Sequence, residues 1–321
     1  MRNTTWKIKT SNQNKSIMLN NFPIDQDILK ILHSRGIVSK KDIINFLDPS
    51  LDNIQPSSLL SDMKKSVDLI IECINNGKNI WIYGDYDVDG ITSTSILYLA
   101  LKDLGAEFLN YYIPIRDEGY GLNNTALKTI KNSGADLLIT VDCGITSFKE
   151  IEFAKSIGLD VIITDHHDIQ SDKIPNAYSI INPKRTDNAF TFNALAGVGV
   201  AFMLILNLYE KLKTKEEAYV YLDLVAIGTI ADIVPLVKEN RIFAKHGLEK
   251  LLYSENKGLR FLITKLFETA KLEFTTYDVG FVIAPVFNAA GRLKDAKMVV
   301  KLLTSDNDRE IEVISKELIN K

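Results

Sequence analysis

Cysteine is scarce in this 321-residue chain, which contains only Cys73 and Cys143. Two cysteines so far apart predict neither a disulfide framework nor a closely spaced pair of metal ligands. The chain also lacks an uninterrupted apolar run of about 18 residues, which argues against a membrane-spanning helix. The amino-terminal stretch contains no apolar signal core, so we expect no secretion and a cytoplasmic location.

An excess of charge of one sign is missing as well, because the formal net charge is −3. Bulk charge therefore gives no indication of nucleic acid, although acidic metal ligands would offset basic residues elsewhere. With 46% hydrophobic and 25% charged residues, the composition is that of an ordinary soluble globular protein. The length predicts about two domains.

The most unusual stretch is IWIYGDYDVDGITST (80–94), in which Asp85, Asp87 and Asp89 alternate ahead of Gly90. Two like charges about 4 Å apart near a protein surface cost on the order of 4 kcal/mol. Cations relieve this repulsion, and hard divalent cations take carboxylate oxygens as ligands. We therefore predict a divalent metal site here.

Two other interpretations of this stretch are a calcium-binding EF-hand loop and a solvated acidic turn. The EF-hand requires a glutamate where this chain has Ile96, and it follows a helix, whereas residues 79–83 read as a buried strand. The solvated acidic turn becomes a weaker interpretation once the acidic residues in the rest of the chain are considered.

Apolar strands alternate with helical patterns from residue 61 onward. The predicted strands are 79–83, 107–113, 136–141 and 161–164, and the predicted helices are 62–75, 91–104, 125–132 and 148–157. This alternation predicts an α/β fold, with a parallel sheet covered by helices on both faces.

Carboxylates and imidazoles follow three of these strands. Asp85, Asp87 and Asp89 follow the first, Asp142 follows 136–141, and the sequence TDHH (164–167) ends the last. Ligands of such sheets bind beyond the carboxyl ends of the strands. Neutral imidazole also ligates transition ions, so His166 and His167 favour manganese beside magnesium.

Residues 196–304 are predicted to be mostly helical. Gly197 and Gly199 weakly resemble a phosphate loop, but close helix packing explains them better. Asp232 is a lone acid in an apolar run and needs a partner or a metal. In residues 288–292, small residues permit a close backbone approach and are flanked by Asn288 and Arg292, of which the arginine suits a bidentate phosphate contact. The alternative is a turn with an exposed arginine.

Several motifs together resemble a known family. YGDYDVDG (83–90), VDCG (141–144), TDHH (164–167) and GTIADIVPL (228–236) resemble the DHH phosphoesterase superfamily. IPIRDEGYGL (113–122), NPKR (182–185), AGVGVAF (196–202) and FNAAGRL (287–293) resemble its RecJ-like members. These members are single-strand-specific 5′→3′ DNA exonucleases that act in DNA repair and recombination.

The resemblance implies a phosphodiesterase with two divalent metal ions, Mn²⁺ or Mg²⁺. It assigns as metal ligands Asp85, Asp87, Asp89, Asp142, His166 and Asp232. All of these except Asp85 would be catalytic together with His167, which orients the phosphate or transfers a proton. Asp165 would hold an imidazole, and Asp142 would bridge both metals. Arg116, Asn288 and Arg292 would bind the strand. Other superfamily members carry histidine where this chain has Tyr83, which puts the first metal in doubt or favours magnesium there.

The resemblance also implies a domain plan and partners. Residues 1–60, with an edge strand at 5–8, form a lead-in. Residues 61–304 form the catalytic domain, with an α/β core to about 195 and a helical part over 196–304. Residues 305–321 begin a linker helix without a terminating signal, so we expect the natural protein to continue into domains absent here. Expected partners are single-stranded DNA, a single-strand-binding protein and a helicase; we expect a monomer without membrane contact.

Two competing functions follow from the same motifs. The first is a superfamily hydrolase acting on nanoRNA, cyclic dinucleotides or pyrophosphate, against which the motifs at 113–122 and 287–293 argue. The second is a non-enzymatic replication scaffold with decayed metal motifs, against which the intact ligand positions argue.

Overall fold

The computed structural model describes residues 17–19, 22–170, 173–267, 269–292 and 296–320. The chain divides into two compact units, Met1–Ile54 and Gln55–Lys321. In the first unit, β1 (Met18–Leu19) pairs antiparallel with β2 (Phe22–Pro23). Helices α1 (Gln26–Ser34) and α2 (Lys40–Leu47) follow, and their apolar side chains form a small core of their own. The strand predicted at 5–8 lies outside the described residues.

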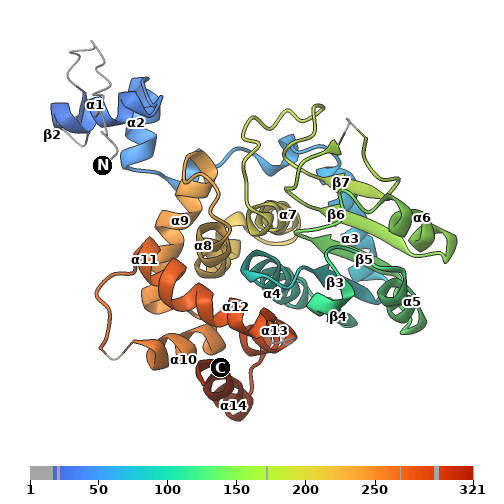
Figure 1. Ribbon diagram of the computed structural model, residues 1–321. Helices are drawn as coiled ribbons and strands as arrows, with labels where there is room; N and C mark the ends of the chain where they lie inside the picture. The colour runs from blue at the N-terminus through green and yellow to red at the C-terminus, as the bar shows by residue number, and fades with distance from the viewer. Residues whose placement is uncertain (1–16, 20–21, 171–172, 268, 293–295, 321) are drawn as a thin grey trace, which may run out of the picture. The chain divides into compact units, whose positions relative to one another are not determined.

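The second unit is built on a five-stranded parallel sheet (Figure 1). The strand order is β4 (Leu109–Tyr112), β3 (Ile80–Gly84), β5 (Leu137–Val141), β6 (Asp160–Thr164) and β7 (Ser179–Ile181). The chain adds β4 on one side of β3 and then crosses to β5 on the other side. The carboxyl ends of β3 and β5 therefore flank the switch point, where α/β sheets bind ligands.

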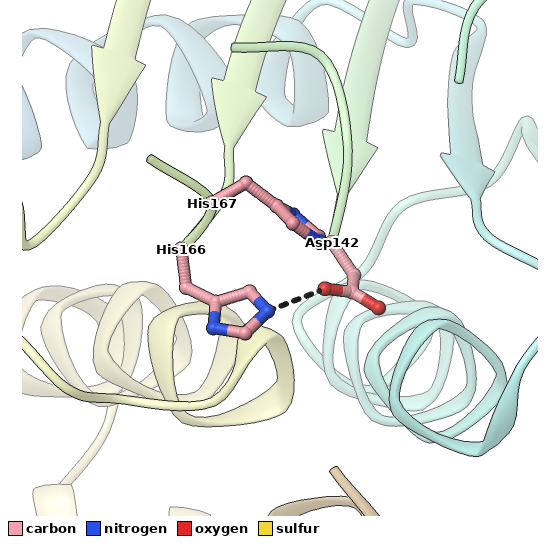
Figure 2. Close-up of side chains that lie close together, drawn as sticks. All are labelled: Asp142, His166 and His167. Atoms are coloured by element: carbon pink, nitrogen blue, oxygen red, sulfur yellow. Dashed lines mark ion pairs between the residues drawn. The ribbon is translucent and has the colours of Figure 1, made fainter. Parts of the chain in front are cut away.

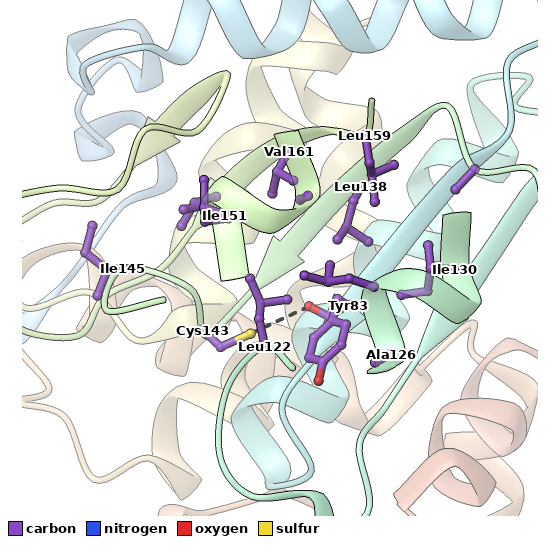
Figure 3. Packing of buried hydrophobic residues seen from close by; sticks show 14 of the residues in the cluster. Tyr83, Leu122, Ala126, Ile130, Leu138, Cys143, Ile145, Ile151, Leu159 and Val161 are labelled. Atoms are coloured by element: carbon purple, nitrogen blue, oxygen red, sulfur yellow. Dashed lines mark hydrogen bonds between the residues drawn. The ribbon is translucent and has the colours of Figure 1, made fainter. Parts of the chain in front are cut away.

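Helices cover both faces of this sheet, as the sequence predicts. On one face, α5 (Asn124–Asn132) and α6 (Phe148–Ser156) bury an apolar cluster that includes Leu138 and Val161 (Figure 3). The other face is covered by α3 (Met63–Asn75), α4 (Val88–Asp103) and α7 (Gly197–Leu212). Strand β5 is buried along its whole length because it contacts helices on both sides.

The rest of the second unit is helical, which confirms the second part of the predicted fold class. Its helices are α8 (Leu222–Ala231), α9 (Lys238–Lys250), α10 (Lys257–Leu266), α11 (Thr276–Asp278), a π-helical turn (Val279–Ile283), α12 (Ala284–Arg292), α13 (Ala296–Thr304) and α14 (Asp308–Ile319). Helix α8 packs between α4 and α9. Among the described residues, every helix is too short or too polar to cross a lipid bilayer.

One element differs from the sequence prediction. Strand β7 was not predicted, because three residues carry too little periodicity to stand out. Helix α13 lies within residues 196–304, which the sequence predicts to be mostly helical. Residues 288–292 belong to helix α12 rather than to the alternative of a turn, and the predicted close backbone approach is present at Gly291, where a Cβ would lie 2.5 Å from the Tyr86 carbonyl oxygen.

Candidate metal centre

The acidic loop, residues 85–89, follows β3, and its last two residues begin α4. Asp87 is the N-cap of α4, and its Oδ1 accepts a hydrogen bond from the Gly90 amide at 3.0 Å. A Cβ atom on Gly90 would lie 2.5 Å from the carbonyl oxygen of Asp85, so only glycine lets the loop fold back on the helix. The loop therefore buries Asp85 and Asp89, which are 4% and 2% exposed.

Asp142 and His166 meet beyond the ends of neighbouring strands β5 and β6 (Figure 2). The Nε2 atom of His166 lies 3.1 Å from Asp142 Oδ1, 3.7 Å from Asp232 Oδ2 and 3.9 Å from Asp89 Oδ2. The 3.1 Å contact is not aligned as a hydrogen bond, and Asp142 Oδ1 accepts none from the described residues. Four side chains far apart in sequence thus converge on one point.

The first turn of α7 binds Asp89. The backbone amides of Gly197 and Val198 donate to its two carboxylate oxygens at 2.6 and 2.8 Å. The amino-terminal end of a helix favours negative charge, so α7 stabilises this carboxylate. The glycine motif that the sequence assigned to close packing does pack closely, because a Cβ on Gly197 would lie 2.4 Å from Asp142 Oδ1.

Three overlapping groups of side chains offer ligand atoms within 4.8 Å of one another. They are Asp85–Asp87–Asp142, Asp89–His166–Asp232 and Asp142–His166–His167. Asp142 and His166 each belong to two groups, so these two residues link the three groups. All six predicted metal ligands are therefore in one place, although their roles stay predictions.

The chemistry of the donors fits divalent cations. The Asp85 and Asp142 Oδ1 atoms are buried carboxylate oxygens without a hydrogen-bond donor among the described residues. Such atoms are costly to bury alone and are suitable ligands for hard cations. The imidazole of His166 adds a ligand that suits manganese.

Electrostatics agree with this fit. Burial and Asp87 raise the pKa of Asp85 to about 7, and burial and Asp87 raise the pKa of Asp232 to about 6. Burial and neighbouring carboxylates also raise the pKa of Asp89 and of Asp142. Burial and His167 lower the pKa of His166 to about 4, so its imidazole is neutral and offers a lone pair. Divalent cations would relieve the repulsion among the carboxylates.

His167, which also belongs to one of these groups, takes part in a hydrogen-bond network with Asp165 and Tyr120. Its Nδ1 lies 2.7 Å from Asp165 Oδ1, and this hydrogen bond is the main reason that the pKa of His167 is raised. Asp165 Oδ2 accepts from the Ile145 amide at 2.8 Å, so the carboxylate that orients the imidazole is itself fixed. The Tyr120 hydroxyl lies 3.1 Å from both ring nitrogens. Asp165 thus holds an imidazole, as the resemblance implies.

Of the predicted strand-binding residues, Arg116 lies beside the acidic loop. Its guanidinium carbon is 4.9 Å from the centroid of the Tyr86 ring. Helix α12, which contains Asn288, reaches the same loop, because a Cβ on Gly291 would lie 2.5 Å from the Tyr86 carbonyl oxygen. The side chain of Arg292 lies outside the described part of the structure.

Comparisons with known proteins agree with this geometry. Residues 79–229 match the family described as "DHH family, N-terminal domain". A solved structure of exonuclease RecJ bound to manganese is 36% identical, with a TM-score of 0.75, over 84% of this chain and 67% of that one. The chain belongs to the DHH family. RecJ of Bacillus subtilis is 40% identical over 98% of this DHH chain, and RecJ of Escherichia coli is 37% identical over 90%.

The relatives are longer than this DHH chain. It spans 39% of the Bacillus subtilis RecJ and 51% of the Escherichia coli RecJ. The solved structure of Thermus thermophilus RecJ with Mn²⁺ has a TM-score of 0.76 and 34% identity, and the chain covers 40% of it. The likeness to these three relatives therefore concerns roughly half of each or less.

Tyr83, which the resemblance matches with a histidine of other superfamily members, lies in the core of this DHH chain (Figure 3). Its side chain is fully buried, its hydroxyl donates to the Gly121 carbonyl oxygen at 2.9 Å, and its ring stacks on Tyr112. We expect Tyr83→Phe to lower the free energy of unfolding by about 1–3 kcal/mol, because the Gly121 carbonyl loses a buried donor.

Manganese affinity should not change in the same variant, since the phenol is hydrogen-bonded within the apolar cluster. Urea unfolding and a calorimetric Mn²⁺ titration would measure the two quantities. A tenfold or larger loss of Mn²⁺ affinity at unchanged stability would place the Tyr83 hydroxyl at the metal centre instead.

Sequence reasoning missed two residues at this DHH site. Tyr120, within the quoted motif at 113–122, carried no signal of its own, because a tyrosine after a glycine is common in loops. Ile233 follows Asp232 with a φ of 61° and is 88% exposed. A β-branched residue in the left-handed region is a genuine outlier, and Asp142 adopts the same region at 59°.

Proposed function

We propose that this chain is the core of a metal-dependent 5′→3′ exonuclease that hydrolyses phosphodiester bonds of single-stranded DNA. One observation carries the proposal: Asp142, His166 and Asp232, from three separate elements, converge on one point in a chain whose relatives are RecJ exonucleases. The chain provides less than two thirds of those relatives, so the activity of the whole protein is part of the proposal.

Two groups of side chains would hold the two ions. Asp85, Asp87 and Asp142 would hold one, and Asp89, His166 and Asp232 the other, with Asp142 near both. The bound Mn²⁺ or Mg²⁺ ions would supply positive charge for the attacking and leaving oxygens of the phosphodiester. The protein fixes the ligands beforehand, since Asp87 caps α4 and Asp89 is bound by the first turn of α7.

Other residues would handle the proton and the strand. The hydrogen bond to Asp165 favours the protonated form of His167, which lets the imidazole donate to a phosphate oxygen or to the leaving group. Arg116 would contact a neighbouring phosphate through its planar guanidinium, and Asn288 and Arg292 of α12 would bind the strand beside the same acidic loop.

The same proposal extends to the setting of the enzyme. Single strands arise during DNA repair and recombination, where a helicase separates the duplex and a single-strand-binding protein covers the product. We propose both as partners, and a monomer acting in the cytoplasm.

A manganese-dependent assay on single strands labelled at either end would test the proposal. Shortening from the 5′ end, abolished by EDTA, is the expected result, with intact duplex resistant. The Asp142→Asn variant, purified in parallel, controls for contaminating nuclease. Cleavage of dinucleotides alone would contradict the exonuclease and favour the nanoRNA or cyclic-dinucleotide hydrolases. Manganese binding without cleavage of any phosphodiester would contradict enzymatic function altogether.

A further inference from the structure

A cavity of about 660 Å³ opens directly beside the metal centre, and His166 forms part of its wall. Its volume is in the range of pockets that take small ligands. Apolar side chains, among them Ile169, Leu195, Val234 and Pro235, line one part of it, and polar or charged side chains line the rest. Apart from His166, its lining residues belong neither to the proposed metal ligands nor to the predicted strand-binding residues.

Cations distinguish this cavity from the acidic centre. Lys184 and Arg185 both line it, together with two acids, Asp168 and Asp187. Contacts within the protein hold Arg185 in place. Its guanidinium binds Asp187 at 2.6 Å and Asp62 at 2.7 Å, and it donates to the Ile180 carbonyl oxygen. Of these two cations, the one that remains for a ligand is Lys184.

Lys184 is held in place by its own motif, NPKR. Asn182 is fully buried, donates to the His167 carbonyl oxygen at 3.1 Å and accepts from the Lys184 amide at 2.8 Å. The backbone of Lys184 is thereby tied to the paired histidines. Its ammonium contacts Asp168 Oδ1 at 2.8 Å, and the Asp168 side chain is 90% exposed. An exposed ion pair of this kind is weak and exchanges readily for a better partner.

We propose that this cavity is a nucleotide subsite, in which Lys184 contacts a phosphate next to the scissile one and the apolar wall receives the sugar and base. This inference rests on the proposed function, because it assigns the cavity to one nucleotide of the DNA strand that the exonuclease would bind. Lysine binds phosphate as a point charge, and the cavity supplies that charge beside a centre whose carboxylates would repel a phosphate.

Substitutions of the two members of the Lys184–Asp168 ion pair should change nucleotide affinity in opposite directions. Lys184→Gln removes the phosphate contact and should raise the Kd for thymidine 5′-monophosphate about tenfold, as for the loss of one charged hydrogen bond. Asp168→Asn removes the competing carboxylate and should lower that Kd severalfold. Lys184→Arg, which keeps the charge, should bind nearly as well as the unchanged chain.

The experiment is an equilibrium titration of the 321-residue chain with thymidine 5′-monophosphate, and with thymidine as the phosphate-free probe. EDTA is present in one series and Mn²⁺ in the other, which separates the cavity from the metal centre. Lys155→Gln is the charge-matched control. Lys155 is exposed near the end of α6, which leads to the amino end of β6, whereas the cavity lies beside the metal centre beyond the carboxyl ends of the strands. Thermal unfolding of each variant checks the fold.

The outcomes separate this inference from the proposed function. Equal effects of Lys184→Gln and Lys155→Gln, or an equal loss of thymidine binding in Lys184→Gln, would overturn the phosphate contact. Absence of any nucleotide binding would overturn the subsite. A chain that binds the monophosphate through Lys184 but cleaves no strand would support the subsite and contradict the exonuclease.

Discussion

Replacement of Asp142 by asparagine is expected to abolish strand cleavage while leaving the fold intact. Asp142 is the carboxylate that belongs to two of the three ligand groups, so its loss weakens both ion positions at once. Substitutions of residues that merely support a metal ligand cost about 10–100-fold, so loss of this ligand should cost at least about 100-fold in activity and in Mn²⁺ affinity.

Stability should not fall in the Asp142→Asn variant. Asparagine tolerates the left-handed backbone of position 142, where alanine would be strained. It also removes a buried carboxylate whose pKa is raised by burial and by Asp89, so repulsion in the centre decreases. In metal-free buffer the midpoint of thermal unfolding is therefore expected to stay level or to rise.

A matched control is Asp160→Asn, at the exposed first residue of β6, because this residue lies at the amino ends of the strands and the metal centre lies beyond their carboxyl ends. Activity and Mn²⁺ affinity of this variant should equal those of the unchanged chain. Full activity of Asp142→Asn in the same assay would show that the assigned centre does not perform the hydrolysis.

Gly197→Ala should have the second largest effect, although it changes no ligand. The added Cβ would lie 2.4 Å from Asp142 Oδ1 and 2.7 Å from its Cβ and Cγ, so either α7 or Asp142 has to shift. Such a shift also displaces the amide that binds Asp89. Misplacement of a catalytic group by about 1 Å can cost roughly 100-fold, and we expect a loss of that order.

The same helix offers the control for this variant. At Gly199, the nearest atom to an added Cβ is Leu195 Cδ2 at 3.4 Å, an ordinary contact. Gly199→Ala should keep activity and gain up to about 1 kcal/mol of stability, since alanine favours helix. Activity assays and urea unfolding on both variants are the measurements. Equal activity of the two would mean that α7 does not position the centre.

The sequence was sufficient to predict as metal ligands six of the carboxylate and imidazole residues that the structure brings together. The rule that parallel strands end on one edge brought together Asp85, Asp142 and His166 without any coordinates. The contact between Asp89 and Gly197 could not be predicted this way, because it joins residues 108 positions apart through the docking of a helix. Periodicity shows which face of a helix is apolar, but not which backbone amide meets which carboxylate.

Tyr120 and strand β7 show the same limit. Tyr120 acts through the position of its hydroxyl beside His167, which depends on the path of a loop. Strand β7 has three residues, and its pairing with β6 rather than its pattern makes it a strand. Tertiary contacts determine both features, so the local sequence pattern could not predict them.

The left-handed backbone at Ile233 sets a limit on how this protein can be made more heat-resistant. A strained residue of this kind costs about 1–3 kcal/mol, so selection for thermal tolerance would favour glycine or asparagine at this position. Either substitution would relax the turn that follows Asp232 and hold the Asp232 carboxylate less firmly in position. Engineering for heat resistance should therefore start at positions outside this turn, such as exposed positions on the surfaces of the helices.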